Sequence, residues 1–439
     1  ALVPTAPKAG KVVSEKSMPE ISVTEWTLSN GIKVYVKPTD YKADELLFRA
    51  WSPGGLSQLK DEDVLRGQLA TSAIGSGGVG NYSLIDLRKK LNGKIANAAP
   101  FINELNEGVS GSASPKDVET LMQLIWLRFT SPRADTTAFQ ALLQQYSAAL
   151  ANKDADPQSV FGDTVQVTLA QGNPRVRPID VSRLKELNLK RMEEIYRDRL
   201  SDVTDATFLF VGTIELAVLK PLVEEWIGSL PASGRKEIGK DVGPTLFAGK
   251  ISKTVKKGIA PQSNSLLILA GKAPWSREQS YLASSLSDLL EMRLTDRLRE
   301  AMGGTYGVSV SASISRTPRQ EFQVAVQFGS APDKAEALYN AVLQEMDSLK
   351  RVPPSKAEIE RVKEQQIREL EVAKKQNNYW ISALTSRLEY GDDPAGIATA
   401  DRLISTLTAQ QLQEAAKKYL DTTNMARFVL QPEAPPAKP

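Results

Sequence analysis

Arg299 and Tyr306 are the residues of this 439-residue chain whose types and spacing best suit chemistry. They stand seven positions apart, on either side of the pair Gly303-Gly304. Arginine offers a planar fork of hydrogen-bond donors, and tyrosine offers a phenolic donor. Together they could hold a peptide carbonyl and stabilise a developing oxyanion, as positioned donors do in acyl transfer. On the residues alone the blander arrangement is the commoner one, with Arg299 on a solvated helix face and Tyr306 packed in a sheet.

The segment around this pair predicts a long helix, a turn and a strand. Leucines recur at helical spacing between positions 282 and 298, so residues 277–302 are expected to form a helix that stops at the two glycines. Alternating apolar and polar residues predict strands at 308–314 and 322–328. The end of the helix would present Arg299, and the start of the following strand would present Tyr306.

The chain contains no histidine and no cysteine. Metal sites built on imidazole or thiolate, Ser-His-Asp triads, Cys-His dyads and disulfides are therefore excluded. Any chemistry must use Asp, Glu, Lys, Arg, Tyr, Ser or the backbone. This favours a protein that assists chemistry carried by a partner, or one that performs none.

Length and charge exclude further classes. A chain of this length predicts two or three domains. The net charge of +3 gives no reason to expect a nucleic-acid partner. No apolar run reaches the roughly 18 residues of a membrane helix. The chain starts at Ala1 without an apolar signal core, so any export signal is expected to have been removed. The compartment stays open, with a bacterial periplasm favoured over the cytoplasm.

Strand and helix patterns occur in two successive sets, which indicates an internal repeat. Residues 111–117 (GSASPKD) open a strongly apolar helix, and residues 329–334 (GSAPDK) open its counterpart. Tyr196 precedes a predicted buried strand at 207–211, and Tyr419 precedes another at 427–430. Two related domains are therefore expected.

The expected fold class is α+β, with two related domains that each contain a mostly antiparallel sheet with helices packed on one face. Strands are expected at 25–28, 32–36, 46–51, 95–102, 107–112 and 265–270, in addition to those named above. Helices are expected at 65–74, 84–91, 115–127, 139–152, 160–170, 189–199, 215–227, 332–349, 356–376, 381–390 and 409–419. The expected division is a tether at 1–20, a first domain at 21–245, a second domain at 250–432 and a tail at 433–439.

The turn carrying Arg299 and Tyr306 resembles the second-half signature of the pitrilysin/insulysin (insulinase-like) zinc metallopeptidases. Residues 29–34 (SNGIKV) resemble the opening hairpin of that family's domains, and residues 210–212 (FVG) resemble a strand that ends its first repeat. The resemblance extends over nearly all of residues 21–432. It implies a half-clamshell of two domains in which Arg299 holds substrate backbone and Tyr306 helps to stabilise the tetrahedral intermediate.

The family's zinc motif, His-x-x-Glu-His, is missing from the first helix of the first domain. That helix reads LRGQLATS over residues 65–72, so Gly67, Ala70 and Thr71 stand where the ligands and the general base would be. None of these side chains can bind zinc. The chain therefore resembles the inactive half, or inactive subunit, of such a peptidase, and it is expected to be inactive alone.

The resemblance implies that zinc belongs to a catalytic partner, either a preceding half of one original chain or a separate subunit. The chain itself would bind neither metal nor cofactor, and would bind peptide substrates inside a heterodimer-like assembly. A structural or peptide-binding subunit without any catalytic part is the alternative, although a pure scaffold has no need of both donors. A carboxylate-only hydrolase using Glu104 and Glu107 is a third, remote option, since both residues suit positions flanking a turn equally well.

Overall fold

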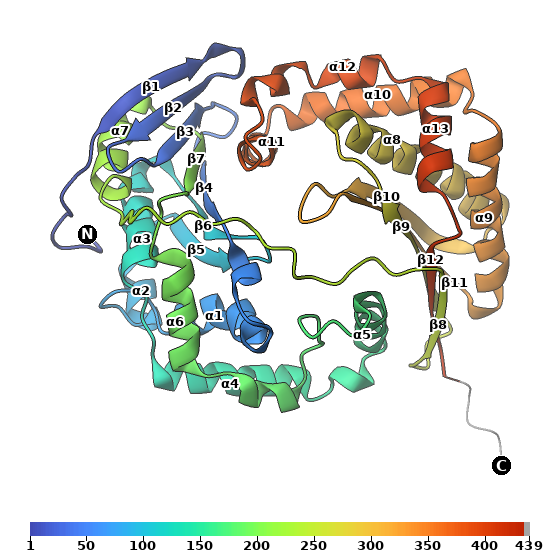
Figure 1. Ribbon diagram of the computed structural model, residues 1–439, viewed down its shortest axis with the longest axis horizontal. Helices are drawn as coiled ribbons and strands as arrows, with labels where there is room; N and C mark the ends of the chain where they lie inside the picture. The colour runs from blue at the N-terminus through green and yellow to red at the C-terminus, as the bar shows by residue number, and fades with distance from the viewer. Residues whose placement is uncertain (434–439) are drawn as a thin grey trace. The chain divides into compact units, whose positions relative to one another are not determined.

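The structure is a computed structural model that describes residues 1–433, except for the side chains of residues 300 and 301. Of the expected tail at 433–439, all but Glu433 lies outside the described residues. The described chain divides into two compact units, and each contains one sheet (Figure 1). Unit 1 comprises residues 1–147, 181–242 and 370–400, and the described part of unit 2 comprises residues 148–180, 243–369 and 401–433.

The sheet of unit 1 has seven strands, in the order β1-β2-β3-β7-β4-β6-β5. All neighbours are antiparallel except β3 and β7. The strands are β1 (Val12–Met18), β2 (Val23–Leu28), β3 (Lys33–Pro38), β4 (Leu46–Pro53), β5 (Ala96–Ile102), β6 (Asn106–Ala113) and β7 (Thr207–Gly212). The helices are α1 (Val64–Ser76), α2 (Leu84–Lys90), α3 (Val118–Thr130), α4 (Thr136–Leu150), α6 (Leu189–Leu200), α7 (Leu216–Leu222) and α11 (Asn377–Leu388).

The sheet of unit 2 has five strands, in the order β10-β11-β9-β12-β8. Here β12 and β8 are the parallel pair. The strands are β8 (Lys250–Lys256), β9 (Ser263–Lys272), β10 (Thr305–Ile314), β11 (Glu321–Ser330) and β12 (Met425–Gln431). The helices are α5 (Pro157–Ala170), α8 (Arg277–Leu294), α9 (Ala335–Arg351), α10 (Lys356–Ala373), α12 (Asp401–Ser405) and α13 (Ala409–Tyr419).

The predicted α+β fold and internal repeat are confirmed. Read from the parallel pair, the order β3-β7-β4-β6-β5 of unit 1 has the same connectivity as β8-β12-β9-β11-β10 of unit 2. Pro115 and Pro332 each open a short 3₁₀ turn that leads into α3 and α9. Tyr196 and Tyr419 are fully buried on α6 and α13, just before the central strands β7 and β12.

Each sheet buries one face against its main helices. In unit 1, Phe48 and Phe208 lie in a core with Leu121 and Met122 of α3. In unit 2, Leu269 and Val326 lie in a core with Leu286 of α8 and other helical residues. Strand residues alternate between the two faces, and helical residues recur on one stripe, so both patterns place apolar side chains in the same layer.

One further helix packs on the opposite face of each sheet, and it comes from a distant part of the chain. Trp380 and Leu384 of α11 pack against Leu209 and Val211 of β7. Phe161 of α5 packs in the same way against strands of unit 2. The sheet in the first half of the chain is therefore covered by a helix from the second half, and the reverse (Figure 1).

The expectation of a tether over residues 1–20 is wrong for residues 12–18, because these form an ordered strand. Residues 12–18 form β1, which pairs antiparallel with β2, and Leu2 is buried. Strand β8 was also not expected. Both are polar edge strands whose side chains are mostly exposed, so neither shows the apolar alternation that marks a half-buried strand. Over the residues described, no helix has the length and apolar composition to cross a membrane.

Candidate functional site

The turn between α8 and β10 is built on two glycines with different roles. After α8 the chain continues as a π-helical segment, Thr295–Ala301, and then Gly303 adopts a φ of +54°. The Gly303 N–H donates to the Arg299 carbonyl at 3.1 Å, and the Gly304 N–H donates to the Leu298 carbonyl at 3.0 Å. These bonds satisfy carbonyls at the helix end. A Cβ on Gly304 would lie 2.8 Å from Cδ2 of Leu338, so this position is closed to larger residues.

Tyr306 stands at a β-bulge. The pairing of β10 with β11 shifts between Thr305 and Gly307, which leaves Tyr306 as the extra residue. The Thr305 hydroxyl lies 2.7 Å from the Gly329 carbonyl and 2.8 Å from the Gly307 carbonyl, and it accepts from the Gly307 N–H at 3.1 Å. A bulge re-aims one side chain away from the regular alternation. The threonine thus stabilises the backbone that displays the phenol.

The structure places both predicted donors on the surface of unit 2, on the two arms of one turn. Tyr306 is 68% exposed and does not pack in the sheet, and Arg299 is also exposed, next to fully buried Leu298. The expectation that Tyr306 packs in the sheet is therefore wrong, and Arg299 is exposed at the helix end. Sequence reasoning missed Thr305. The signal was a β-branched hydroxyl between glycines, in Gly304-Thr305-Tyr306-Gly307.

The first helix of unit 1 has an apolar interior where the family resemblance would place zinc chemistry. Gly67 and Ala70 are buried on α1, and Thr71 is partly buried. A Cβ on Gly67 would meet Cδ1 of Leu59 and would lie 2.6 Å from Cδ2 of Leu56, so leucine methyls fill that space. Zinc requires imidazole, thiolate or carboxylate ligands, which this set does not offer. In the part of the chain described, no cluster of three acidic residues could hold a metal ion elsewhere.

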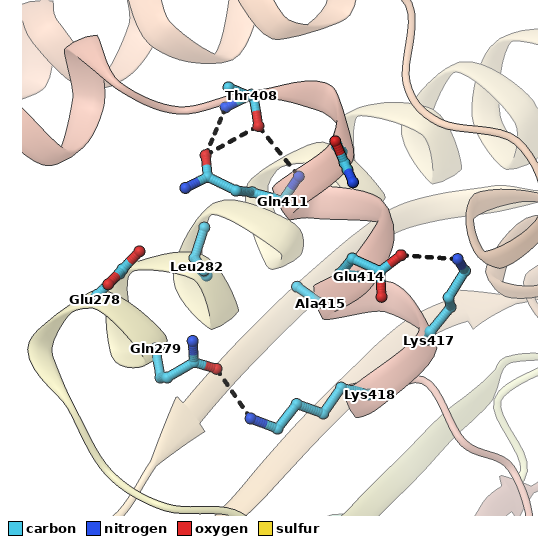
Figure 2. Close-up of a pocket in the computed structure, with 10 residues that line it drawn as sticks. Glu278, Gln279, Leu282, Thr408, Gln411, Glu414, Ala415, Lys417 and Lys418 are labelled. Carbon is cyan, nitrogen blue, oxygen red and sulfur yellow. Dashed lines mark hydrogen bonds and ion pairs between the residues drawn. The ribbon is translucent and has the colours of Figure 1, made fainter.

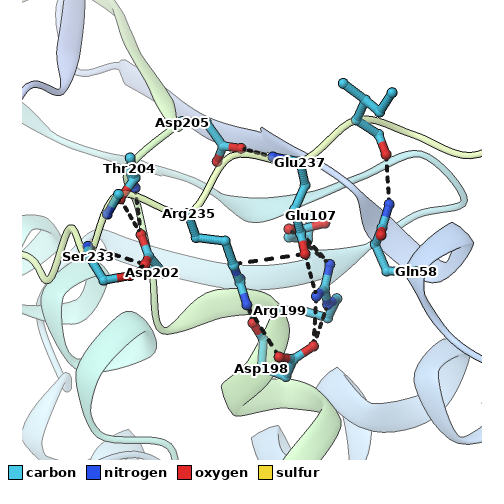
Figure 3. Close-up of polar contacts among 12 residues, drawn as sticks. Gln58, Glu107, Asp198, Arg199, Asp202, Thr204, Asp205, Ser233, Arg235 and Glu237 are labelled. Atoms are coloured by element: carbon cyan, nitrogen blue, oxygen red, sulfur yellow. Dashed lines mark hydrogen bonds and ion pairs between the residues drawn. The ribbon is translucent and has the colours of Figure 1, made fainter.

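An ion cluster around two buried residues, Glu107 and Arg199, lies at the start of β6 (Figure 3). Arg199 donates to both carboxylate oxygens of Glu237, at 2.7 and 3.1 Å, and to Asp198 at 2.7 Å. Glu107 is only 2% exposed, accepts from the Gly55 N–H and lies 3.8 Å from Arg199. Burial raises the pKa of Glu107 to about 8, against the opposing effects of the Gly55 N–H and Arg199.

The remote carboxylate-pair option receives no support from this geometry. Glu107 is enclosed in the cluster, whereas Glu104 is exposed in the turn between β5 and β6. A glycosidase-type pair needs two carboxyl groups that face one substrate. The arrangement instead fits a structural role for Glu107, which holds the strained Gly54-Gly55 turn ahead of α1.

A cavity of about 590 Å³ opens between α8 and α13, at some remove in sequence from the Arg299 turn (Figure 2). Its cationic groups already have partners. Lys417 pairs with Glu414 at 2.8 Å, and Lys418 donates to Gln279 at 3.0 Å. The same amide oxygen of Gln279 accepts from the Tyr419 hydroxyl at 2.7 Å. The two bonds to Gln279 join α13 to α8, so this amide serves the packing of the two helices.

Comparisons with known proteins agree with the resemblance. Residues 186–366 match the family described as "Peptidase M16 inactive domain". The chain is 25% identical to "Zinc protease PQQL-like" from Arabidopsis thaliana, over 95% of this chain and 44% of the relative. It is 22% identical to "Probable zinc protease PqqL" from Escherichia coli, over 96% of this chain and 45% of the relative. The chain thus spans less than half the length of these curated relatives.

Solved structures share the fold. The periplasmic protease PqqL from Escherichia coli superposes with a TM-score of 0.84 at 21% identity, over 99% of this chain and 48% of that chain. A peptidase M16 inactive domain from Pseudomonas fluorescens superposes with a TM-score of 0.75 at 16% identity, over 95% of this chain and 100% of that chain. Residues 186–366 thus match the inactive domain of the M16 peptidases, and nearly the whole chain is similar to zinc proteases in sequence and to M16 peptidase structures in fold.

Proposed function

We propose that this chain is the noncatalytic half of a zinc metalloendopeptidase and lends Arg299 and Tyr306 to peptide cleavage at a zinc site held by a catalytic partner. The observation that supports this most is the contrast between the two predicted sites. The helix that would hold zinc has an apolar interior at Gly67, whereas the Arg299–Tyr306 turn is kept exposed by a glycine pair and a threonine-braced bulge.

In this proposal each donor has its own role. The Arg299 guanidinium binds substrate backbone carbonyls, since it presents several N–H groups in a fixed plane. The Tyr306 hydroxyl donates a hydrogen bond to the oxyanion of the tetrahedral intermediate, where charge develops. Fixing the bulge in advance matters because a donor that is already in place needs no reorganisation during the reaction.

The proposed partner is a zinc-bearing half of the same family, on the same original chain or as a separate subunit. The relatives named zinc proteases are more than twice as long as the part that matches this chain, which leaves room for such a half. The proposed substrates are peptides. A bacterial periplasm is the proposed compartment, because the Escherichia coli structure with the same fold is described as periplasmic.

The decisive experiment is Tyr306→Phe in the assembled enzyme, formed by this chain and its zinc-bearing half. We expect turnover to fall by about 10²–10³-fold, because one oxyanion donor is lost. Zinc content should not change. Tyr41→Phe serves as the matched control, since Tyr41 is an exposed tyrosine of unit 1. Unchanged turnover in Tyr306→Phe would contradict the proposed role.

Two further variants, both at Thr305, test how the Tyr306 hydroxyl is positioned. Thr305→Val removes the hydroxyl that bonds to Gly307 and Gly329, and we expect it to lower turnover with unchanged zinc content. Thr305→Ser keeps the hydroxyl and should restore most of the activity. Purified chain without its partner should show no peptidase activity. Co-purification with a non-peptidase assembly, and no zinc-bearing partner, would instead support a structural or peptide-binding subunit.

A further inference from the structure

A polar cavity of about 520 Å³ lies on the face of the unit 1 sheet that α11 covers only in part. Strands β4 and β6 form its floor and α11 forms one wall. Residues of four kinds line it: an arginine, Arg49; a carboxylate, Glu389; hydroxyl and amide side chains, Ser110, Ser112, Asn378, Ser382, Thr385 and Ser386; and apolar groups that include Leu47 and Ile381. The cavity therefore combines one cation and one carboxylate with neutral hydrogen-bonding groups.

Arg49 is the unusual member of this set. Its Nε is buried and donates to no acceptor, and its guanidinium carbon lies 4.9 Å from the ring centroid of Phe101. No carboxylate whose side chain is described forms an ion pair with it. A partly buried cation without an anion is costly, because the protein replaces water without returning a counter-charge. In the same unit, by contrast, the Arg199 guanidinium donates four hydrogen bonds to the carboxylates of Glu237 and Asp198.

The hydroxyl groups nearby are suited to complete a site for an oxygen anion. The Ser112 hydroxyl oxygen accepts from Asn97 Nδ2 at 2.9 Å, which leaves its own hydrogen available to donate. Thr385 differs, because its hydroxyl donates to the Ile381 carbonyl at 2.6 Å and can only accept from a ligand. A carboxylate has about four acceptor positions, so it can take the arginine fork and one or more hydroxyl donors together.

Glu389 also lines the cavity and bears on the choice of ligand. It accepts from Asn106 Nδ2 at 2.7 Å, which holds it at the end of α11. A small free dianion would be repelled by this carboxylate. A peptide can satisfy both charges, because its carboxylate meets Arg49 while its backbone N–H groups donate to Glu389. The combination therefore favours a peptide carboxylate over inorganic anions.

We propose that the cavity around Arg49 is a subsite for a carboxylate of a bound peptide, either an acidic side chain or a free C-terminus. Its relevance to proteolysis rests on the proposed function, since it gives the peptide-binding chain a preference for acidic or C-terminal segments. Arg49 supplies the bidentate donor, Ser112 adds a hydroxyl, and Leu47 and Ile381 contact the aliphatic part of the ligand.

The test uses the full chain and three peptides of one length with an uncharged fluorescent label, measured by fluorescence anisotropy. One has a free C-terminal carboxylate, one has a C-terminal amide and a single internal Glu, and one has a C-terminal amide and no acid. Wild type should bind one or both carboxylate peptides more tightly than the neutral one. Arg49→Gln should weaken that binding about 10- to 100-fold, as expected for a charged hydrogen-bonded pair, down to the level of the neutral peptide.

Matched variants separate recognition from net charge. Arg49→Lys keeps the charge but loses the fork and should be intermediate. Arg368→Gln removes the same charge from a side chain that is 79% exposed on α10 and should have no effect. Ser382→Glu places a carboxylate at an exposed position of the cavity wall and should abolish the preference even if Arg49→Gln fails to fold.

Two results would overturn the subsite. One is wild-type binding that is equal for the three peptides, or absent for both carboxylate peptides. The other is an equal loss of affinity for all three peptides in Arg49→Gln. Failure of the proposed function is a separate result, since it appears as unchanged turnover of neutral peptides in Tyr306→Phe.

Discussion

The two units of this chain repeat one topology, but the helical connection between their second and third equivalent strands differs. In unit 1, β4 leads through α1 and α2 to β5, and in unit 2, β9 leads through α8 and its π-helical end to β10. The first connection packs leucine methyls against Gly67, and the second exposes Tyr306 on a bulge. The strand order is thus compatible with either arrangement, and the difference lies in a few residues at the helix and its end.

A second contrast concerns α11 and α5, which pack on the sheet faces opposite to the main helices. Trp380 of α11 is 7% exposed, donates from Nε1 to the Lys374 carbonyl at 2.9 Å and lies under the Lys37 ammonium, 3.8 Å from the ring centroid. Burial lowers the pKa of Lys37 to about 8. Phe161 of α5 makes apolar contacts, as part of a smaller core cluster. Helix α11 is therefore held by polar as well as apolar contacts, and α5 chiefly by apolar ones.

The largest expected effect comes from removing these two aromatic side chains. Trp380→Ala and Phe161→Ala should each lower the free energy of unfolding by about 3–5 kcal/mol, because each leaves a cavity under a covering helix. Hydrogen exchange measured by mass spectrometry should rise in β7 for Trp380→Ala and in β12 for Phe161→Ala. Trp380→Phe keeps an aromatic ring over Lys37 and should cost less. Faster exchange confined to the helix itself would contradict its role in covering the sheet.

A smaller effect is expected at the filled position of α1. Gly67→His should lower the free energy of unfolding by about 1–3 kcal/mol, because the new side chain meets Leu56 and Leu59 in a packed space. Gly75→His is the control on the same helix, since a Cβ there meets nothing within 4 Å. Urea denaturation compares the two variants. Equal midpoints would show that the space beside Gly67 is not closed.

A pH dependence of stability is expected at the ion cluster of unit 1. Because the folded state raises the pKa of Glu107 from 4.5 to about 8, the native chain holds this proton more tightly than the unfolded chain. The resulting stability is complete below pH 4.5 and is lost as the pH rises through 8. Between pH 5 and 8 we expect the free energy of unfolding to fall by roughly 3–4 kcal/mol, since the native carboxyl keeps a proton that the unfolded chain releases and one pKa unit corresponds to about 1.4 kcal/mol.

Glu107→Gln should remove this slope, because the amide resembles the protonated acid. The range between pH 5 and 8 suits this measurement, because the chain has no histidine that would titrate there. Glu358→Gln in unit 2 is the contrasting variant. Although burial raises the pKa of Glu358, hydrogen bonds from Arg293 and Ser355 hold it below its ordinary value. That variant should leave the slope between pH 5 and 8 in place. An identical slope in wild type and Glu107→Gln would contradict the assignment.

Much of the fold could be predicted from the sequence, because periodicity and helix stops are local signals. The helix at 277–302, its glycine stop and the alternating strands after it are all observed. The edge strands β1 and β8 could not be found this way, since their partners supply the pairing while their own side chains face water. The predicted domain limits also could not show that α5 and α11 pack on sheets distant in sequence.

The two candidate sites differ in the same respect, because one is local in sequence and the other joins distant segments. The Arg299–Tyr306 turn is a local feature, so its spacing could be recognised, and the roles of the two donors stay predictions. The Arg49 cavity joins β4 and β6 to α11, which begins more than 300 positions later, and no local pattern connects Arg49 with Ser382. Likewise, the glycine at position 67 gave no indication of which leucines would fill the space beside it.

The exchange of α5 and α11 has a consequence for how the polypeptide matures. Cutting the gene near residues 234–249 would yield two pieces that each lack the helix covering one side of their own sheet. On the ribosome, the β-sheet formed by the earlier segments must wait until residue 400 has been synthesised before that side can be closed. We therefore expect a product truncated before α11 to expose Leu209 and Val211 to solvent and to other nascent chains.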